Sequence, residues 1–461
     1  MKLHKDKARS WRTCPGIEIA ERGGNPVQEQ SRPNILLMIC HDLGRHLGCY
    51  GVDGLETPNI NELARRGIRF TDYFCTAPQC SPSRGSIMTG RLPHNNGLMG
   101  LAHLGWELDN DIQTLPRVLT DHGYETYLFG LQHEARSRNV ASLGYQHVGR
   151  QGKAWEVADD VTSFLEGRDS SLPFYASVGF FEPHRPYDQP EYTPDNPSKV
   201  SVPSYLPDVP GVRQEVGQLQ GMIRVLDTAV GQILTTLQGT GLWDDTLVIF
   251  TTDHGVAMPR AKGTLYDPGV GTALIMHGSD IAHGQVESSL LSNVDLLPTI
   301  LEYVGAPLPG GIDGRSFLPL LQGAPYEVRD HVHLEVTWHD RYNPTRGIRT
   351  ERYKCIRSFG GRPLVYIPAD IYDSPSGKAV RDEYYGSQRP EEELYDLERD
   401  PLERSNVITH PEYETVAEKL RTQLLSWMEA TNDPLLRGPV ASKEEPQAPY
   451  WNVVDNDSPF E

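Results

Sequence analysis

Continuous apolar runs of strand length recur along the chain, and amphipathic stretches of helical length separate them. Runs this short, without alternating polar residues, are typical of strands that are covered on both faces. The stretches between them space apolar residues three and four positions apart, as in helices with one buried face. Strands are expected at 34–40, 125–130, 174–181 and 246–252, and the clearest helices at 59–66 and 218–237. This alternation predicts an α/β fold with a large, mostly parallel central sheet flanked by helices.

The pattern changes after residue 345. Residues 349–357 and 393–397 read as strands, and residues 410–427 as an amphipathic helix. These elements predict a smaller C-terminal α+β domain. The expected organisation is a tail or arm at 1–30, a catalytic α/β domain at 31–345, a small antiparallel sheet with a helix at 346–437, and a tail at 438–461.

Each apolar run of the large domain leads into polar residues that are able to bind a metal or move a proton. Open α/β sheets place their ligands at the carboxyl ends of their strands, where these residues fall. The residues concerned are His41 and Asp42, Gln132 and His133, His184, and Asp253 and His254.

Charge limits the partners of the protein. The 461 residues include 43 Lys plus Arg and 62 Asp plus Glu, a net charge of −19. Such a surface repels nucleic acid and anionic membranes, so neither is expected as a partner. A small anionic substrate in a locally basic pocket is easier to reconcile with this charge than a long anionic polymer.

Targeting and redox signals are sparse. No apolar run approaches the length of about 18 residues that a membrane span needs, and residues 1–30 lack the apolar core of a signal peptide. The sequence as written therefore predicts a cytoplasmic protein, unless the true start lies elsewhere and hides an export signal. The six cysteines have neither CxxC spacing nor the density of a disulfide scaffold.

The most informative segment is residues 80–91, Cys-Ser-Pro-Ser-Arg-Gly-Ser-Ile-Met-Thr-Gly-Arg. A lone cysteine is often only a small buried hydrophobic residue, so Cys80 by itself would suggest no function. The whole string resembles the signature of type I sulfatases, Cys-x-Pro-Ser-Arg followed by Thr-Gly. The resemblance implies an alkaline-phosphatase-like sandwich fold and a sulfate ester or sulfamate as substrate. It also implies that a maturation enzyme oxidises Cys80 to formylglycine, whose hydrated aldehyde is the nucleophile.

The resemblance further implies one divalent metal ion, bound by strand-end residues and by the formylglycine at Cys80. Positional matching gives His41, Asp42, Asp253 and His254 as the other ligands. The family usually has a carboxylate in place of His41, and its all-oxygen site suits Ca²⁺ or Mg²⁺. Two imidazoles with two carboxylates suit Mn²⁺, Fe²⁺ or Zn²⁺ better. Either the metal is softer than the Ca²⁺ that the family implies, or His41 is a packed histidine and only three protein groups bind.

Catalytic roles for four more residues follow from the same resemblance. Arg84 is expected to hold the hydrated formylglycine, and His133 to contact its second hydroxyl. Lys262 is expected to bind the sulfuryl group, and His184 or Lys262 to protonate the leaving group. The chain departs from the family near Gln132, where a lysine that pairs with the sulfate is missing, so Gln132 is a weaker candidate for a substrate contact.

Several motifs resemble the sulfamidase branch of the family, and the likeness spans roughly residues 33–430. They lie at 95–101, 183–185, 265–269 and 333–337. Within the last of these, Glu335 either meets the amino group of a glucosamine or is a buried carboxylate paired with Arg341 or Arg346. The expected activity is hydrolysis of a small sulfated substrate, a sugar such as glucosamine.

Three other readings stay open. A phosphonate monoester or phosphodiester hydrolase of the same superfamily would share the fold and the nucleophile, and the Asp253-His254 pair favours it slightly. A non-catalytic scaffold that binds a sulfated sugar would explain His41 and the missing lysine as decay of the site. An enzyme that uses the unmodified thiol of Cys80 is the third. The sequence does not decide whether the protein forms a homo-oligomer.

Overall fold

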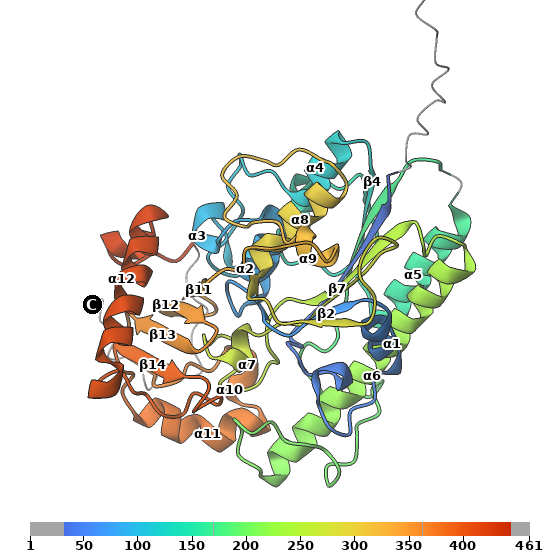
Figure 1. Cartoon of the computed structure of the whole chain (residues 1–461). Coiled ribbons are helices and arrows are strands. Elements are labelled where there is room, and N and C mark those ends of the chain that lie inside the picture. Colours follow the sequence, from blue (N-terminus) through green and yellow to red (C-terminus); the bar gives the residue numbers. More distant parts are fainter. Residues whose placement is uncertain (1–31, 169, 362, 444–461) are drawn as a thin grey trace, which may run out of the picture. The chain divides into compact units, whose positions relative to one another are not determined.

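The computed structural model describes residues 32–168, 170–361 and 363–443, and the described residues from 33 to 443 form one compact unit. An eight-stranded sheet runs through its larger part (Figure 1). The strands of this sheet are β1 (Asn34–Cys40), β2 (Ile68–Phe70), β4 (Glu125–Gly130), β5 (His147–Val148), β6 (Phe174–Gly179), β7 (Thr246–Thr252), β8 (Leu274–His277) and β9 (Gln285–Glu287). A two-stranded parallel pair is formed by β3 (Tyr73–Phe74) and β10 (Leu291–Ser292).

The strand order of the large sheet is β5-β4-β6-β1-β7-β8-β2-β9. All pairings from β5 to β7 are parallel, whereas β8 runs antiparallel to β7 and to β2. The four predicted strands are therefore confirmed as the contiguous parallel centre β4-β6-β1-β7. The third is shorter than predicted, because β6 ends at Gly179 and not at residue 181.

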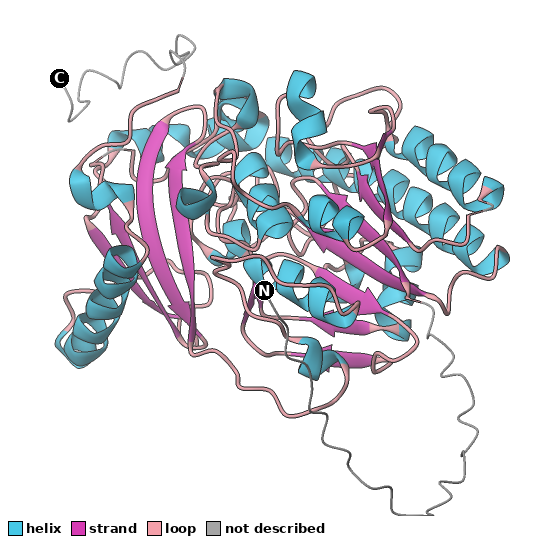
Figure 2. Cartoon of the chain, turned by 90° about the horizontal axis from the view of Figure 1, so that it is seen from above, coloured by secondary structure: helices cyan, strands magenta, loops and turns pink. Residues whose placement is uncertain are grey.

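Helices cover both faces of this sheet (Figure 2). Alternate residues of β1 point to opposite faces, so Leu36 and Met38 join one core while Ile35 and Leu37 join the other. The first core contains α1 (Pro58–Arg66), α5 (Ala154–Gly167) and α6 (Pro210–Gly239). The second contains α2 (Cys80–Thr89), α4 (Leu115–Asp121), α8 (Leu296–Tyr303) and α9 (Leu318–Leu321). The predicted α/β class is confirmed.

A separate antiparallel sheet, β11-β12-β13-β14, forms the smaller part, and α12 packs on it (Figure 2). Its elements are β11 (His331–Trp338), β12 (Tyr342–Thr350), β13 (Tyr353–Ser358), β14 (Glu392–Asp396) and α12 (Glu414–Ala430). The remaining α-helices of the described chain are α3 (Pro93–Asn96), α7 (Asp267–Val270), α10 (Ala369–Tyr372) and α11 (Pro375–Gly386). The first strand, β11, precedes the domain boundary that the sequence predicted at residue 346.

The single strand predicted at 349–357 is wrong. The chain turns there between β12 and β13, and the hydroxyl of Thr350 accepts a hydrogen bond from the N–H of Tyr353 at 2.9 Å. The turn contains neither Gly nor Pro, so no local pattern of residues predicts it. The predicted strand at 393–397 corresponds to β14. The predicted helix at 410–427 begins later, at Glu414, after a single 3₁₀ turn.

No helix among the described residues is long and apolar enough to cross a membrane. The five cysteines that the structure describes are all unpaired, in agreement with the absence of a disulfide pattern. The predicted arm at 1–30 and most of the predicted tail at 438–461 lie outside the described residues.

Candidate active site

The carboxyl ends of β4, β6, β1 and β7 are neighbours in the sheet, and a predicted site residue follows each of them. Parallel pairing sets Cys40 of β1 beside Thr252 of β7, so the segments after both strands leave the sheet together. The N–H of Asp42 donates a hydrogen bond of 3.0 Å to Oδ1 of Asp253 and joins these two segments. Asp42 has a φ of 50°, which is uncommon for a residue with a side chain and marks a constrained turn.

The turn after β7 requires glycine at position 255. A Cβ on Gly255 would lie 1.9 Å from the carbonyl oxygen of Pro268, so the backbones touch with no room for a side chain. The N–H of Gly44 binds the carbonyl of His254 at 2.8 Å and fixes the same turn from the β1 side. The Asp-His-Gly sequence is therefore held rigidly at the edge of the sheet.

Five buried side chains converge at this edge and form what we call the Cys80 cluster: His41, Asp42, Cys80, Asp253 and His254. Each offers one atom able to bind a metal, and these atoms all lie within 4.8 Å of one another. Nδ1 of His41 lies 2.8 Å from Oδ1 of Asp42 and 3.3 Å from Oδ2 of Asp253. Nε2 of His254 lies 3.0 Å from Oδ1 of Asp42 and 3.4 Å from Sγ of Cys80.

The electrostatics of the Cys80 cluster suit a cation. Burial lowers the pKa of His41, but the charges of Cys80, Asp253 and Asp42 outweigh burial and raise it to about 9. Burial raises the pKa of Asp42, but Lys262 and the histidines outweigh it and hold that pKa well below the usual range. Carboxylates this deeply buried are stable only beside positive charge. The donor set of two carboxylates, two imidazoles and the residue-80 side chain fits a divalent metal ion.

Helix α2 presents Cys80 at its first position. Pro82, two residues later, is tolerated because the N–H groups of the first helical turn have no partner inside the helix. Gly90 ends the helix with a φ of 63°. Nε of Arg84 donates to Oδ2 of Asp253 at 2.9 Å, so one arginine links α2 to the end of β7. Burial raises the pKa of the Cys80 thiol, but nearby positive groups outweigh it and hold the pKa well below the usual range.

Two further histidines extend the cluster. Nδ1 of His133 lies 3.1 Å from Nε2 of His41, which leaves Nδ1 of His41 facing the carboxylates. Outer partners of this kind fix the orientation of a metal-binding imidazole. Nε2 of His184 lies 3.8 Å from Oδ2 of Asp42, while its Nδ1 lies 2.6 Å from the carbonyl oxygen of Arg185. Burial lowers the pKa of His184 to about 4.

Lys262 approaches the cluster from the loop after β7. Its Nζ lies 2.8 Å from Oδ2 of Asp42 and 2.8 Å from Oδ2 of Asp370. Only 1% of the residue is exposed. Burial lowers the pKa of Lys262, but Asp370 and Asp42 outweigh it, so the pKa is raised well above its usual value. The structure thus brings all the predicted catalytic residues together with the predicted metal ligands.

Sequence reasoning missed two residues of this site, Asp370 and His339. Asp370 lies in the short helix α10, which no apolar pattern announced. His339 follows β11, so the polar pair His339-Asp340 repeats the strand-end signal that identified the other site residues. That signal would have found His339 had it been applied beyond the large domain.

The two predicted substrate contacts bond to other protein groups. The amide of Gln132 exchanges hydrogen bonds of 2.9 Å with the backbone N–H and carbonyl of Ala135. Glu335 lies in a second buried group, which we call the Arg346 cluster: His94, Glu335, Arg346 and Asp433. Of the two readings of Glu335, this placement favours the buried carboxylate paired with Arg346. Substrate roles for Gln132 and Glu335 stay predictions.

Two family models match the chain. The model described as Sulfatase matches residues 33–306, which carry the whole Cys80 cluster. The chain belongs to the sulfatase family. The model described as N-sulphoglucosamine sulphohydrolase, C-terminal, matches residues 260–375, which include Lys262, His339 and Asp370. The predicted family and its enzyme class, hydrolases of sulfuric ester or sulfamate bonds, are confirmed.

Individual relatives agree with this assignment. Human N-sulphoglucosamine sulphohydrolase is 30% identical, and the match covers 93% of this chain and 96% of that protein. An ulvan-active sulfatase of Formosa agariphila is also 30% identical, over 87% of this chain and 81% of the relative.

Solved structures share the fold. One, a complex with its substrate D-glucosamine-2-N,6-O-disulfate, has a TM-score of 0.68 at 21% identity and covers 87% of this chain and 99% of its own. The phosphonate monoester hydrolase of Agrobacterium radiobacter has a TM-score of 0.69 at 21% identity and covers 91% and 100%. The fold alone therefore does not distinguish a sulfatase from a phosphonate hydrolase.

Proposed function

We propose that the protein hydrolyses the sulfate ester or sulfamate of a sugar such as glucosamine, with a formylglycine made from Cys80 as the nucleophile. The observation that carries the proposal is the convergence of Cys80 with two carboxylates and two imidazoles within 4.8 Å, in a chain of the sulfatase family. The relative named N-sulphoglucosamine sulphohydrolase spans nearly the whole chain, and a structural neighbour binds a sulfated glucosamine. Both support a sulfated sugar as substrate.

The surroundings of residue 80 place it for catalysis. A formylglycine there supplies, when hydrated, one hydroxyl that attacks sulfur and a second whose proton is lost when sulfate is released, so one difficult step becomes two easier ones. A formylglycine-generating enzyme is then a required partner. Arg84 holds Asp253 against residue 80 from one side, and His254 lies 3.4 Å from Sγ of Cys80 on the other. His133, behind His41, is placed to take up the second proton.

The metal proposed for the Cys80 cluster is a first-row transition ion rather than Ca²⁺. Nδ1 of His41 faces both carboxylates while its Nε2 is occupied by His133, which is the arrangement of a metal-binding imidazole with an outer partner. With His254, this gives two nitrogen ligands, which suit Mn²⁺, Fe²⁺ or Zn²⁺ better than a hard cation. A bound divalent ion supplies positive charge that lowers the pKa of a nearby hydroxyl and stabilises the sulfuryl oxygens.

Lys262 is the group best placed to neutralise the substrate and to meet the leaving atom. Its ammonium is fixed by Asp42 and Asp370, so it needs no reorganisation when negative charge develops. His184 lies on the same side, 3.8 Å from Oδ2 of Asp42. Lys262 is therefore proposed as the main proton donor to the leaving oxygen or nitrogen. His184 lies near it and is proposed to take part in the same proton transfer.

Turnover of matched substrates tests this proposal. Protein produced together with a formylglycine-generating enzyme is assayed with glucosamine N-sulfate, glucosamine 6-O-sulfate, 4-nitrophenyl sulfate and 4-nitrophenyl phenylphosphonate. A kcat/KM for at least one sulfated sugar that exceeds the value for the phosphonate supports the proposal. A higher kcat/KM for the phosphonate would move the assignment to a phosphonate monoester hydrolase. No turnover of any sulfated compound by protein with formylglycine at residue 80 would contradict the proposal.

The metal is tested separately by elemental analysis of the purified protein. Stoichiometric Mn, Fe or Zn, with activity lost on chelation and restored by the same ion, is the expected result. Stoichiometric Ca or Mg would show that His41 acts as a packed histidine and that oxygen ligands dominate.

A further inference from the structure

The turn between β11 and β12 carries His339, which has neither a catalytic nor a metal-binding role in the proposed function. His339 is 6% exposed, and its Nδ1 lies 2.6 Å from Oδ1 of Asp340. Its Nε2 is buried and has no hydrogen-bond partner. A buried polar atom left without a partner costs about 1–3 kcal/mol, so a turn that holds one in place calls for a reason.

The ring of His339 belongs to the surroundings of residue 80. Burial lowers its pKa, but the hydrogen bond to Asp340 and the interaction with Cys80 outweigh burial and raise the pKa to about 9, while Lys262 acts in the opposite direction.

A second set of contacts fixes Asp340, and through it the histidine. Oδ1 of Asp340 accepts a hydrogen bond from the hydroxyl of Tyr366, and its Oδ2 accepts one from the N–H of Ala369 at 3.1 Å. The residue after Ala369 is Asp370, which binds Nζ of Lys262. One short segment therefore holds both the His339-Asp340 pair and the catalytic lysine.

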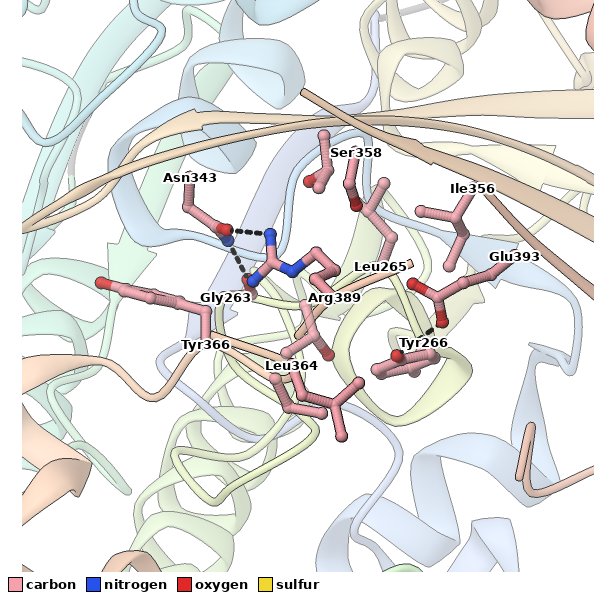
Figure 3. A pocket seen from close by; sticks show the side chains of 13 residues that line it. Gly263, Leu265, Tyr266, Asn343, Ile356, Ser358, Leu364, Tyr366, Arg389 and Glu393 are labelled. Carbon is pink, nitrogen blue, oxygen red and sulfur yellow. Dashed lines mark hydrogen bonds between the residues drawn. The ribbon is translucent and has the colours of Figure 1, made fainter. Parts of the chain in front are cut away.

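Two residues that hold this region, Asn343 and Tyr366, line a neighbouring cavity (Figure 3). Tyr366 lies beside Gly263, where an added Cβ would come within 3.0 Å of the tyrosine ring. Asn343, at the start of β12, donates to the carbonyl of Gly263 at 3.3 Å and accepts from Nη1 of Arg389 at 2.5 Å. The residue before Gly263 is Lys262, so both ends of the His339 turn are tied to the lysine loop.

Most of the catalytic groups near residue 80 already have a partner within the protein. Nε of Arg84 is bonded to Asp253, and Nζ of Lys262 is bonded to two carboxylates. His133 is bonded to His41, and Nδ1 of His184 to a backbone carbonyl. Among the described residues of the site, three side-chain atoms are buried without a partner: Nη2 of Arg84, Oδ1 of Asp370 and Nε2 of His339. A carboxylate oxygen repels an anion, so Nη2 of Arg84 and Nε2 of His339 are the two of these atoms that suit one.

We propose that His339 binds the sulfate or sulfamate group of the substrate through Nε2, and that Asp340 is the residue that positions it. The inference rests on the proposed function, and it assigns to the small sheet a direct part in substrate binding. Asp340 acts through His339 and is not itself expected to touch the substrate.

The test uses the full chain, matured at residue 80, with inorganic sulfate as the binding probe and 4-nitrophenyl sulfate as the substrate. His339→Asn keeps an amide where Nδ1 was and removes the Nε2 position, whereas His339→Gln extends an amide toward the Nε2 position. We expect H339N to raise KM and to weaken sulfate binding about tenfold, as for the loss of one good hydrogen bond, with a smaller change in kcat. H339Q should recover most of the affinity, and D340N should fall between the two.

His331→Asn, at the start of β11 and so at the opposite end of the strand from the His339 turn, is the matched control and should leave both constants unchanged. Equal sulfate affinity in calorimetry for wild type and H339N would overturn the inference, and so would a failure of the wild type to bind sulfate. Absence of turnover by matured wild type would instead contradict the proposed function. In that case the sulfate titrations of wild type, H339N and H339Q still decide whether His339 binds the anion. Similar melting temperatures show that the variants fold.

Discussion

The Cys80 cluster and the Arg346 cluster are two buried groups of charged side chains that share carboxylates and histidine, and they differ in their sets of possible metal ligands. In the Arg346 cluster the guanidinium lies 2.5 Å from Oδ2 of Asp433 and 3.4 Å from Oε2 of Glu335. Nδ1 of His94 lies 2.9 Å from Glu335, and burial, which lowers the pKa of His94, is outweighed by that carboxylate. Two negative groups thus meet a fixed arginine and a histidine that favours its charged form.

The carboxylates of the Cys80 cluster are paired as well, Asp253 with Arg84 and Asp42 with Lys262. Each cluster also has a buried nitrogen without a partner, Nη2 of Arg84 beside the Cys80 cluster and Nε2 of His94 in the Arg346 cluster. The clusters differ in the number of converging ligand atoms, which is five around Cys80 and three in His94, Glu335 and Asp433. The comparison teaches that buried carboxylates and histidines do not by themselves mark an active site. What distinguishes the Cys80 cluster is its larger donor set, in which a cysteine and two imidazoles converge with two carboxylates.

Loss of the nucleophile should have the largest effect on activity. Cys80→Ala is expected to lower kcat/KM for sulfate esters by at least ~10³-fold, because residue 80 makes the covalent bond. The fold should persist, since alanine fits a helix start. Cys355→Ala, buried in the small sheet, is the control and should keep its activity. Residual turnover of C80A within tenfold of wild type would show that another group is the nucleophile.

Loss of Arg346 should destabilise the Arg346 cluster without abolishing the activity that depends on the Cys80 cluster. Arg346→Met leaves Glu335 and Asp433 buried without their guanidinium, and we expect a loss of about 3–5 kcal/mol in the free energy of unfolding. Urea denaturation measures this loss. The kcat of the remaining folded enzyme should stay within about twofold of wild type. A loss below about 1 kcal/mol would show that Arg346 does not stabilise the buried carboxylates of Glu335 and Asp433.

Removing one proposed ligand should sharpen the contrast further. His41→Ala deletes a nitrogen donor, and we expect metal affinity to fall at least ~10-fold, measured by competition with a coloured chelator. His133→Ala, which removes the outer partner of His41, should weaken affinity by about 10- to 100-fold. Unchanged metal affinity in H41A would assign His41 to packing and leave the remaining cluster residues as the ligands.

The smallest effect concerns pH and a histidine beside the Arg346 cluster. His333 stacks on Trp427 with ring centroids 4.4 Å apart, and burial lowers its pKa to about 3. Its unfolded pKa is about 6.5, so the folded state binds this proton more weakly. The stability that depends on neutral His333 is present above pH 6.5 and is lost as the pH falls toward 3.

His333→Phe removes this titration and should reduce the loss of stability between pH 7 and pH 5 by about 1–2 kcal/mol relative to wild type. Urea denaturation at both pH values provides the measurement. The two proteins should show parallel behaviour above pH 7, where His333 is neutral in both states. If wild type and H333F lose the same free energy of unfolding between pH 7 and pH 5, His333 binds its proton equally well in the folded and unfolded states.

Much of the site was predictable because strand-end residues follow directly from apolar runs. Once 34–40 and 246–252 read as parallel strands, His41, Asp42, Asp253 and His254 had to share one edge of the sheet. The string after Cys80 supplied the nucleophile. Asp370 was not predictable, because it meets Lys262 only through a loop of the small sheet that no local pattern places.

The distinction between the two clusters was equally hidden in the sequence. Glu335 and Asp253 are both carboxylates next to apolar strands, and only the structure shows that Arg346 reaches one of them and not the other. The turn at Glu351-Arg352 was missed for a related reason: it has ordinary strand composition and is fixed by a side-chain hydroxyl of Thr350.

Peptide mass spectrometry of residue 80, in protein from its native host or produced with a formylglycine-generating enzyme, tests the central claim most directly. The account predicts the mass change of cysteine converted to formylglycine at residue 80, and unmodified cysteine at residues 40, 75 and 355. An unmodified thiol at residue 80 in folded protein that still turns over sulfate esters would contradict the account. The protein would then be assigned as an enzyme that uses the thiol of Cys80 itself.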